Sequence, residues 1–347
     1  MLSGLPVIDL HHHYIPPALL TSLQALANGK ARLVNHLVSV TLNPDLADVE
    51  AHLEAMARAG IDLAVVAYSA LSALGPEVCA SLNEAVAELQ ADHPAAFLGA
   101  AHVDLRDPAT AVRELVRCES ELGLRALALP TSAPALQLDD PSLAPLWDKA
   151  EQLGLPIILH PASLPVGAST DHGLERSCAR PFDTTTAIVR LMHAVLPLHP
   201  TLRFVAPHCG GTAPYLKGRL QMFHTAPGER PRSLPRTQRE LHDEGLDDQF
   251  ERLWRQLYVD TAGNGGWTPV VRAALDIVSA DRVCFGSDYP LEAHSPETMT
   301  ELVDAMASLQ LPKADLAAVA FANAASLLGL RDLAGAPTDP TGPASAS

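Results

Sequence analysis

The stretch Pro141-Ser-Leu-Ala-Pro-Leu-Trp-Asp-Lys-Ala-Glu-Gln-Leu-Gly154-Leu-Pro-Ile-Ile-Leu-His160 contains the unit on which the fold prediction rests. Its first part starts with proline, has helical periodicity and stops at Gly154, which are the usual start and stop signals of an α-helix. Its second part, residues 156–160, is a short and nearly continuous apolar run. Such runs are typical of parallel strands that are buried on both faces. The stretch therefore predicts a helix followed by a buried strand that ends in a histidine.

Short apolar runs and segments of helical period alternate in the same way along most of the chain. The runs predicted as strands are residues 6–10, 62–68, 97–103, 125–129, 156–160, 202–208, 256–260 and 282–287. The helices predicted between them include residues 45–59, 76–92, 108–122, 141–153 and 183–196. This alternation favours a (β/α)8 TIM barrel over an open doubly wound sheet. No Gly-x-Gly-x-x-Gly follows the first strand, which argues against a dinucleotide-binding domain.

Two segments depart from the alternation. Residues 212–255, rich in Arg, Glu and Pro, form a long insertion between strands six and seven. Because long connections after barrel strands build the active-site face, we expect this insertion to lie there. Residues 331–347 are rich in Ala, Pro, Thr and Ser and are expected to be a disordered tail. The sequence thus predicts a single barrel domain over residues 1–330.

Composition limits the classes of function. Nearly half of the 347 residues are apolar, which is enough for a large core, and the formal net charge is −16. An acidic surface disfavours nucleic acids and anionic membranes as partners. The five cysteines are widely spaced and contain no Cys-x-x-Cys, as expected for reduced thiols. No apolar run is long enough to span a bilayer, so we expect a cytoplasmic protein.

The chemistry-bearing residues begin with Asp9-Leu-His11-His12-His13 at the end of the first predicted strand. Side chains alternate across a strand, so His11 and His13 point to one side and His12 to the other. Two imidazoles on one side of a barrel strand end form half of a metal site. A polar cluster or a chance run of histidines is the alternative explanation of these residues alone.

Three further residues end predicted strands. His160 ends the fifth strand, His208 ends the sixth and is followed by Cys-Gly-Gly, and Asp288 follows the eighth. Each of them alone could be structural. In a closed barrel, however, the carboxyl ends of the strands converge, and active sites form at that face. Together with the first-strand pair, these residues predict a metal site with an acid or base beside it.

The motifs taken together resemble the amidohydrolase-related (amidohydrolase 2) family, whose members include aminocarboxymuconate semialdehyde decarboxylase and γ-resorcylate decarboxylase. The resemblance rests on His-x-His in the first strand, His160, His208-x-Gly-Gly and Gly286-Ser-Asp-Tyr-Pro290. It implies one divalent metal, usually zinc and sometimes manganese. The roles that the resemblance implies are metal ligands at His11, His13, His160 and Asp288, proton exchange at His208 and Asp288, and binding of a substrate carboxylate at Arg219.

The sequence is compatible with three functions. The favoured one is a metal-dependent, non-oxidative decarboxylase, a carboxy-lyase of an aromatic or unsaturated carboxylic acid, because Arg219 suits a carboxylate. The alternative is a hydrolase of a lactone, amide or C–C bond on the same site. The third is a non-catalytic metal-binding protein. By resemblance we expect a homodimer in which Arg219 reaches a small-molecule substrate across the interface. His12 and His52 are expected to lie away from the site, His52 on a solvated face.

Overall fold

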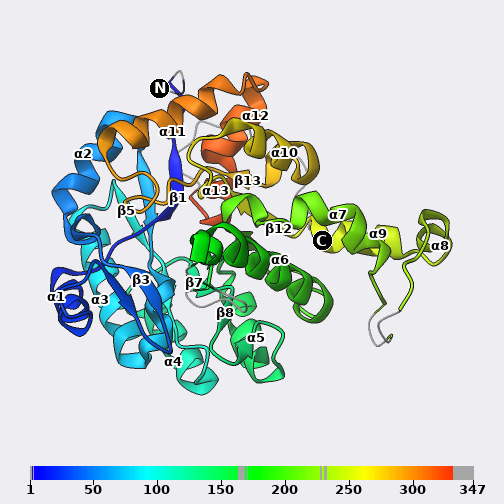
Figure 1. The fold of residues 1–347 in the computed structure, drawn as a ribbon, viewed down its shortest axis with the longest axis horizontal. Coiled ribbons are helices and arrows are strands. Elements are labelled where there is room, and N and C mark those ends of the chain that lie inside the picture. Colours follow the sequence, from blue (N-terminus) through cyan, green and yellow to red (C-terminus); the bar gives the residue numbers. More distant parts are fainter. Residues whose placement is uncertain are drawn as a thin grey trace, which may run out of the picture.

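A computed structural model describes residues 2, 4–162, 169, 171–226, 229 and 233–330 of the chain (Figure 1). The predicted disordered tail, residues 331–347, lies outside the described residues. Figure 1 shows the strands at the centre of the molecule and the helices around them. The helices are α1 Pro17–Leu26, α2 Val49–Ala59, α3 Pro76–Asp92, α4 Pro108–Ser120, α5 Ala144–Leu153, α6 Arg180–Arg190, α7 Ala213–Met222, α8 Gln238–Asp243, α9 Leu246–Trp254, α10 Thr268–Val278, α11 Pro296–Ser308, α12 Lys313–Ala317 and α13 Asn323–Leu327.

The strands form a (β/α)8 barrel, as the sequence predicts. The barrel strands within the described residues are β1 Ile8–His12, β4 Leu63–Val66, β5 Phe97–Gly99 with β6 Ala101–His102, β7 Leu127–Pro130, β10 Ile157–His160, β11 Phe204–Ala206, β12 Leu257–Asp260 and β13 Val283–Cys284. Each falls inside or overlaps one of the predicted runs. One sheet has the order β1-β4-β5 and the other β13-β12-β11-β10-β7-β6, and the neighbours are parallel.

Backbone hydrogen bonds close the two sheets into one ring. β5 and β6 are two halves of the third barrel strand, and the break between them lies at Ala100. Its first half pairs with β4 and its second half with β7. On the other side, the amide of Leu10 donates to Phe285 and the amide of Asp288 donates to His11. The last strand and its following loop therefore lie against β1, which brings Asp288 to the first-strand histidines.

The core has an inner and an outer layer because alternate strand residues face opposite ways. Ile158 and Val205 belong to an inner cluster formed by side chains of the strands and of α13. Ile157 and Phe204, their neighbours in sequence, belong to a larger cluster that the strands share with the surrounding helices. This two-sided burial explains why the strands are nearly continuous apolar runs. The predicted stop at Gly154 is confirmed, since this residue ends α5 in the left-handed conformation with φ of 66°.

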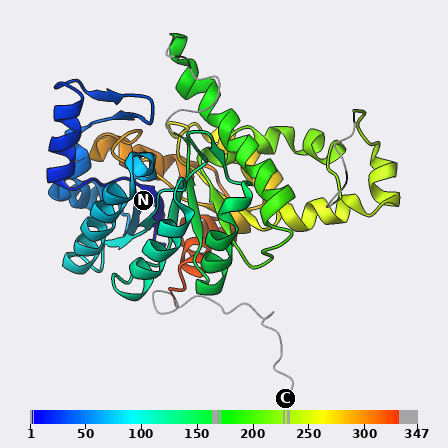
Figure 2. The same ribbon diagram turned by 90° about the horizontal axis from the view of Figure 1, so that it is seen from below.

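Additional strands lie outside the barrel and were not predicted. β2 Arg32–Val34 and β3 Ser39–Thr41 form an antiparallel hairpin after α1, drawn in dark blue in Figure 2. A second small hairpin consists of β8 Ser132–Ala133 and β9 Leu136–Gln137. The insertion at residues 212–255 is largely helical and contains α7, α8 and α9. Both views show α8 and α9 extending away from the barrel as an arm.

Candidate metal centre

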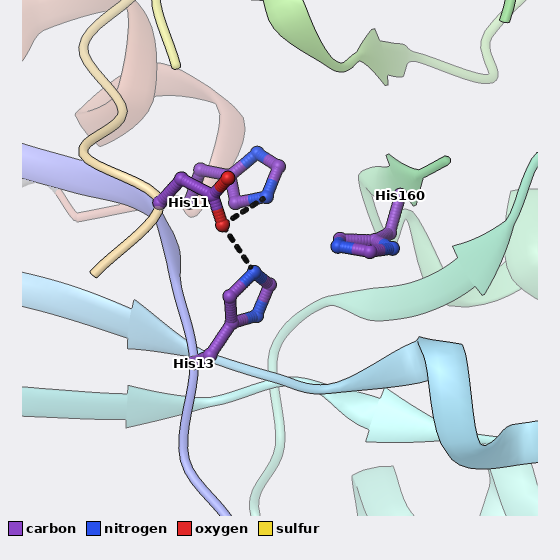
Figure 3. Close-up of side chains that lie close together, drawn as sticks. His11, His13 and His160 are labelled. Atoms are coloured by element: carbon purple, nitrogen blue, oxygen red, sulfur yellow. Dashed lines mark hydrogen bonds and ion pairs between the residues drawn. The ribbon is translucent and has the colours of Figure 1, made fainter. Parts of the chain in front are cut away.

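Four side chains from three parts of the barrel meet at the carboxyl ends of the strands. His11 and His13 come from β1 and the residue after it, His160 ends β10, and Asp288 follows β13. One possible ligand atom from each of these residues lies within 4.8 Å of the others. Figure 3 shows His11 and His13 facing His160 across the gap between their strands. The structure thus brings together the four residues that the sequence analysis assigned to a metal.

In each of the three histidines a protein oxygen lies within hydrogen-bond distance of Nδ1, which makes Nε2 the nitrogen that could bind a cation. The Nδ1 atom of His11 lies 2.8 Å from a carboxylate oxygen of Asp260, and Nδ1 of His13 lies 2.8 Å from the carbonyl oxygen of Ala67. Nδ1 of His160 lies 2.9 Å from the carbonyl oxygen of Pro161. With a cation bound, each Nδ1 would carry the proton and donate, and Nε2 would present its lone pair to the cation. This donor set of three neutral imidazoles and one carboxylate fits a divalent cation such as zinc.

An unpartnered atom supports this fit. Nε2 of His11 is buried and has no hydrogen-bond partner among the described residues. A buried polar atom without a partner costs free energy unless something else binds it. Nε2 of His13 lies 2.8 Å from Oδ1 of Asp288, and Nε2 of His11 lies 3.8 Å from the same oxygen. A cation between these atoms would satisfy all of them at once.

Asp260 is a functional residue that the sequence analysis missed, although it ends a predicted strand. One of its carboxylate oxygens accepts from His11, as described above. Its other oxygen accepts the backbone N–H of His208 at 2.8 Å and that of Ala262 at 3.1 Å. Asp260 is fully buried. A carboxylate behind a ligating histidine fixes the ring orientation and raises the basicity of the ligand. Its strand-end position was the signal that could have identified it.

Burial and neighbouring charges set the protonation states. Burial opposes charge on His11, but the adjacent Asp260 carboxylate raises its pKa to about 9 in the absence of a cation. Burial, together with the charges of His13 and His11, lowers the pKa of His160 well below its usual value. Burial by itself would raise the pKa of Asp288, but the hydrogen bond and charge of His13 and the charge of His11 hold it well below its usual range. The centre therefore offers a carboxylate and a neutral His160.

His208 lies beside the four ligands without being one of them in this cluster. Its Nε2 atom is 3.8 Å from Oδ2 of Asp288 and has no hydrogen-bond partner among the described residues. Its backbone adopts the left-handed conformation, with φ of 56°. Burial and the charge of His11 lower the pKa of His208 to about 4, so the imidazole is neutral at neutral pH. The acid/base role of His208 stays a prediction.

Gly263 fixes where the His208 ring can lie. A Cβ atom added at Gly263 would be 2.3 Å from Cγ of His208 and 2.6 Å from Nδ1 of the same ring. The ring thus packs directly on the backbone of Gly263, which has φ of 77°. Only glycine adopts this conformation readily and leaves room for the ring. The backbone N–H groups of Gly263 and Gly265 both donate to the carboxylate of Glu292, which holds their loop in place.

His12 points away from the centre, as predicted, into a buried network. Its Nδ1 atom is 2.9 Å from Asp9, and its Nε2 atom is 2.7 Å from Nδ1 of His52. His52 is 1% exposed, so the prediction that it lies on a solvated face is wrong. Its ring packs against His12 and Tyr289 behind the first strand. Asp9 also accepts the N–H and hydroxyl of Ser287, so the network links β1 to the segment that carries Asp288.

A cavity of about 610 Å³ opens above the centre. Its lining includes His160, His208 and Asp288, together with Tyr68. Arg176 and Arg180, which precede and begin α6, also line it, as do residues of the β2–β3 hairpin. Pockets of this size bind small organic molecules. The two arginines belong to the connection after the fifth strand, and the sequence analysis did not single them out.

Arg219 is not among the residues that line this cavity. It is an exposed residue of α7, and its guanidinium carbon lies 5.4 Å from the centre of the Phe223 ring. The described lining of the cavity contains no residue of the 212–255 insertion. The hairpin and the start of α6 contribute to the described wall, and the expectation that this insertion builds the active-site face stays a prediction. The role assigned to Arg219 depends on a neighbouring subunit and stays a prediction.

The fold and the centre together define a barrel enzyme of the metal-dependent type. The amidohydrolase family profile matches residues 8–330. This chain therefore belongs to the amidohydrolase family. Among the described helices, none has the length and apolar character needed to cross a membrane.

Several relatives of the chain are decarboxylases. It is 28% identical to decarboxylase orsB of Emericella nidulans, with 93% of this chain and 97% of that protein covered. It is 31% identical to γ-resorcylate decarboxylase of Rhizobium radiobacter over 62% of this chain and 66% of the relative. A crystal structure of 5-carboxyvanillate decarboxylase from Sphingomonas paucimobilis superposes with a TM-score of 0.75. The sequence identity to that protein is 22%, over 94% of this chain and 99% of the other.

Proposed function

We propose that this protein is a metal-dependent, non-oxidative decarboxylase of an aromatic carboxylic acid. The observation that carries the proposal is the set of His11, His13, His160 and Asp288 beneath a cavity, with the neutral His208 beside it. The relatives named above, which act as decarboxylases, support the choice of this reaction over hydrolysis. Arginines in the cavity wall suit an anionic substrate.

The reaction replaces a carboxylate by a proton. The bond between the ring carbon and the carboxyl carbon breaks, CO2 leaves, and the electron pair that stays on the ring carbon takes up a proton. A divalent cation held by the four ligands supplies positive charge that stabilises the negative charge developing on the substrate. The cavity has room for the ring above the ligands.

Two side chains can deliver the proton. Oδ1 of Asp288 faces the histidine ligands, whereas Oδ2 faces Nε2 of His208. A proton that either group takes up from solvent lies at the floor of the cavity, from which it can be delivered to the ring carbon. The low pKa of His208 makes its imidazolium a strong acid, which favours release of the proton to carbon. Solvent then restores the proton after CO2 has left.

The experiment that tests this function is CO2 release from metal-loaded protein. A panel of hydroxybenzoates and muconates is incubated with the enzyme, and both CO2 and the decarboxylated product are measured. We expect at least one hydroxybenzoate to yield equal amounts of CO2 and product. His208→Asn should bind metal normally and lose on the order of 10²–10⁴-fold in kcat, the usual contribution of a positioned acid or base. Hydrolysis of a lactone or amide without any CO2 release would overturn the proposal.

Three finer points belong to the same proposal. The metal is zinc, for which three histidines and a carboxylate are common ligands, and manganese is the competing cation because related decarboxylases have been crystallised with it. The protein acts as a homodimer in which Arg219 contributes to the neighbouring cavity. The protein acts in the cytoplasm, in keeping with five free cysteines, four of them buried.

A further inference from the structure

Three arginines, two of which line the cavity, lie near the buried carboxylate of Glu175. Glu175 is buried, and its Oε1 atom accepts from Arg32 at 2.5 Å and from Arg180 at 3.0 Å. Arg176 donates to the hydroxyl of Thr41 at 2.7 Å. Among the described residues, Arg176 has no carboxylate within ion-pair distance. The three arginines therefore bring three positive charges against one negative charge, which leaves a net charge of +2 in a chain whose formal net charge is −16.

The cluster is not saturated by its own hydrogen bonds. Nε of Arg180 is buried and has no hydrogen-bond partner among the described residues. Arg176 and Arg180 both line the cavity that contains His160 and Asp288, whereas Arg32 does not. Burial and then the charges of Arg180 and Arg32 lower the pKa of Arg176. Charges of the same sign held together in this way are stabilised when an anion binds between them.

The cluster lies on the hairpin side of the cavity. Arg176 is bonded to Thr41, and Arg180 donates to the carbonyl oxygen of Ser39 at 3.3 Å. Both contacts are with β3 of the hairpin, which lies outside the barrel strands that carry the metal ligands. A substrate whose reacting carboxylate lies at Asp288 and His208 can therefore place a second group against this wall.

We propose that Arg176 and Arg180 form an anion subsite and that the substrate is an aromatic dicarboxylate, which loses one carboxylate and is held by the other. This inference rests on the proposed function, because it assumes an aromatic acid in the cavity. Guanidinium groups bind carboxylates through paired and charge-assisted hydrogen bonds. The wall thus selects substrates with a second acid group against those with one.

A matched pair of ligands tests the subsite. 2-Hydroxybenzoate and 4-hydroxybenzene-1,3-dicarboxylate share the ring, the hydroxyl and one carboxylate, and they differ by the second carboxylate. Their dissociation constants are measured by calorimetry on metal-loaded His208→Asn protein, so that neither ligand is consumed. We expect the dicarboxylate to bind on the order of 10- to 100-fold more tightly, since hydrogen bonds to charged groups each contribute about that factor.

Single substitutions show which residues cause the tighter binding of the dicarboxylate. Arg176→Gln, made in the same background, should remove most of the preference for the dicarboxylate and leave the affinity for 2-hydroxybenzoate within about twofold. Arg180→Gln should act in the same direction. Arg239→Gln, which removes an exposed charge of α8, is the control and should keep the preference.

Distinct results would overturn the inference. If the His208→Asn protein with both arginines intact binds the two ligands with equal affinity, no second anion subsite exists. If Arg176→Gln weakens both ligands equally, the arginine binds the reacting carboxylate instead. If Arg239→Gln abolishes the preference as Arg176→Gln does, the preference reflects the overall charge of the protein and not a subsite. Because binding is measured without turnover, absence of CO2 release would refute the proposed function and leave this comparison intact.

Discussion

Gly263 offers a direct way to move His208 without altering any ligand of the centre. In Gly263→Ala the new Cβ atom would lie 2.3 Å from Cγ of His208, much closer than two carbon atoms can approach. The nearest atoms belong to an imidazole ring on a left-handed backbone, so the ring must shift by about 1 Å to restore normal contact. A displacement of this size in an acid/base group costs on the order of 100-fold in turnover.

The loop itself supplies a matched control. Gly265 also has a positive φ, of 56°, and its N–H also donates to Glu292. A Cβ atom at Gly265 would have its nearest neighbour at 3.9 Å, the Oε1 atom of Glu292. Gly265→Ala therefore introduces a similar backbone strain, about 1 kcal/mol, without the contact with His208. A difference between the two variants isolates the position of the ring from the stability of the loop.

The assay compares kcat, metal content and unfolding midpoint for both variants. We expect both to bind metal and to lose a similar, small amount of stability. Gly263→Ala should lose about 100-fold in kcat for CO2 release, whereas Gly265→Ala stays within a few fold of the unsubstituted enzyme. Equal activity of the two variants would show that the position of His208 does not limit the reaction, and the assigned acid/base role would then be wrong.

Three further substitutions test the surroundings of the centre. Asp260→Asn places an amide NH2 against N–H donors, so the metal affinity should fall about 10- to 100-fold. The affinity is measured by titration against a fluorescent competitor for the metal. An unchanged affinity would exclude Asp260 as the residue that orients His11. His12→Ala should keep its metal but lose about 1–3 kcal/mol of stability in urea unfolding, because Asp9 loses a buried partner. Loss of metal in this variant would contradict the assignment that the His12 side chain points away from the centre. Arg219→Lys should raise KM for a carboxylate without changing metal content, and unaltered kinetics would exclude its substrate-binding role.

The barrel could be predicted because its strands are buried on both sides. A run such as residues 156–160 has no polar face, and the helix before it ends at a glycine in left-handed conformation. The metal ligands could be predicted for a related reason. Closure of the ring brings all strand ends to one face, so residues far apart in sequence, such as His11 and His160, meet without any local signal. Periodicity predicts that these strand ends meet, whereas the roles of the individual residues as ligands were implied by the resemblance to the amidohydrolase-related family.

Other parts of the site depend on tertiary contacts that periodicity does not encode. The β2–β3 hairpin has strands of three residues, too short for an alternating pattern to emerge. Arg176 lines the cavity together with Thr41 of that hairpin, to which it donates a hydrogen bond. His52 sits on a helix, where a histidine is usually solvated, and its burial follows from its contact with His12. The long insertion contains α8 and α9, which extend as an arm, and its expected place on the active-site face stays a prediction.

The most direct test of the account is a metal titration of chelated protein in which CO2 release is followed. Protein freed of metal should be inactive, and activity should rise linearly with added zinc or manganese until one equivalent per chain is bound. His160→Ala should remove that stoichiometric site, since it deletes one of the three imidazole ligands. Full CO2 release from metal-free protein, or activity that continues to rise well beyond one equivalent, would contradict a single catalytic metal at His11, His13, His160 and Asp288.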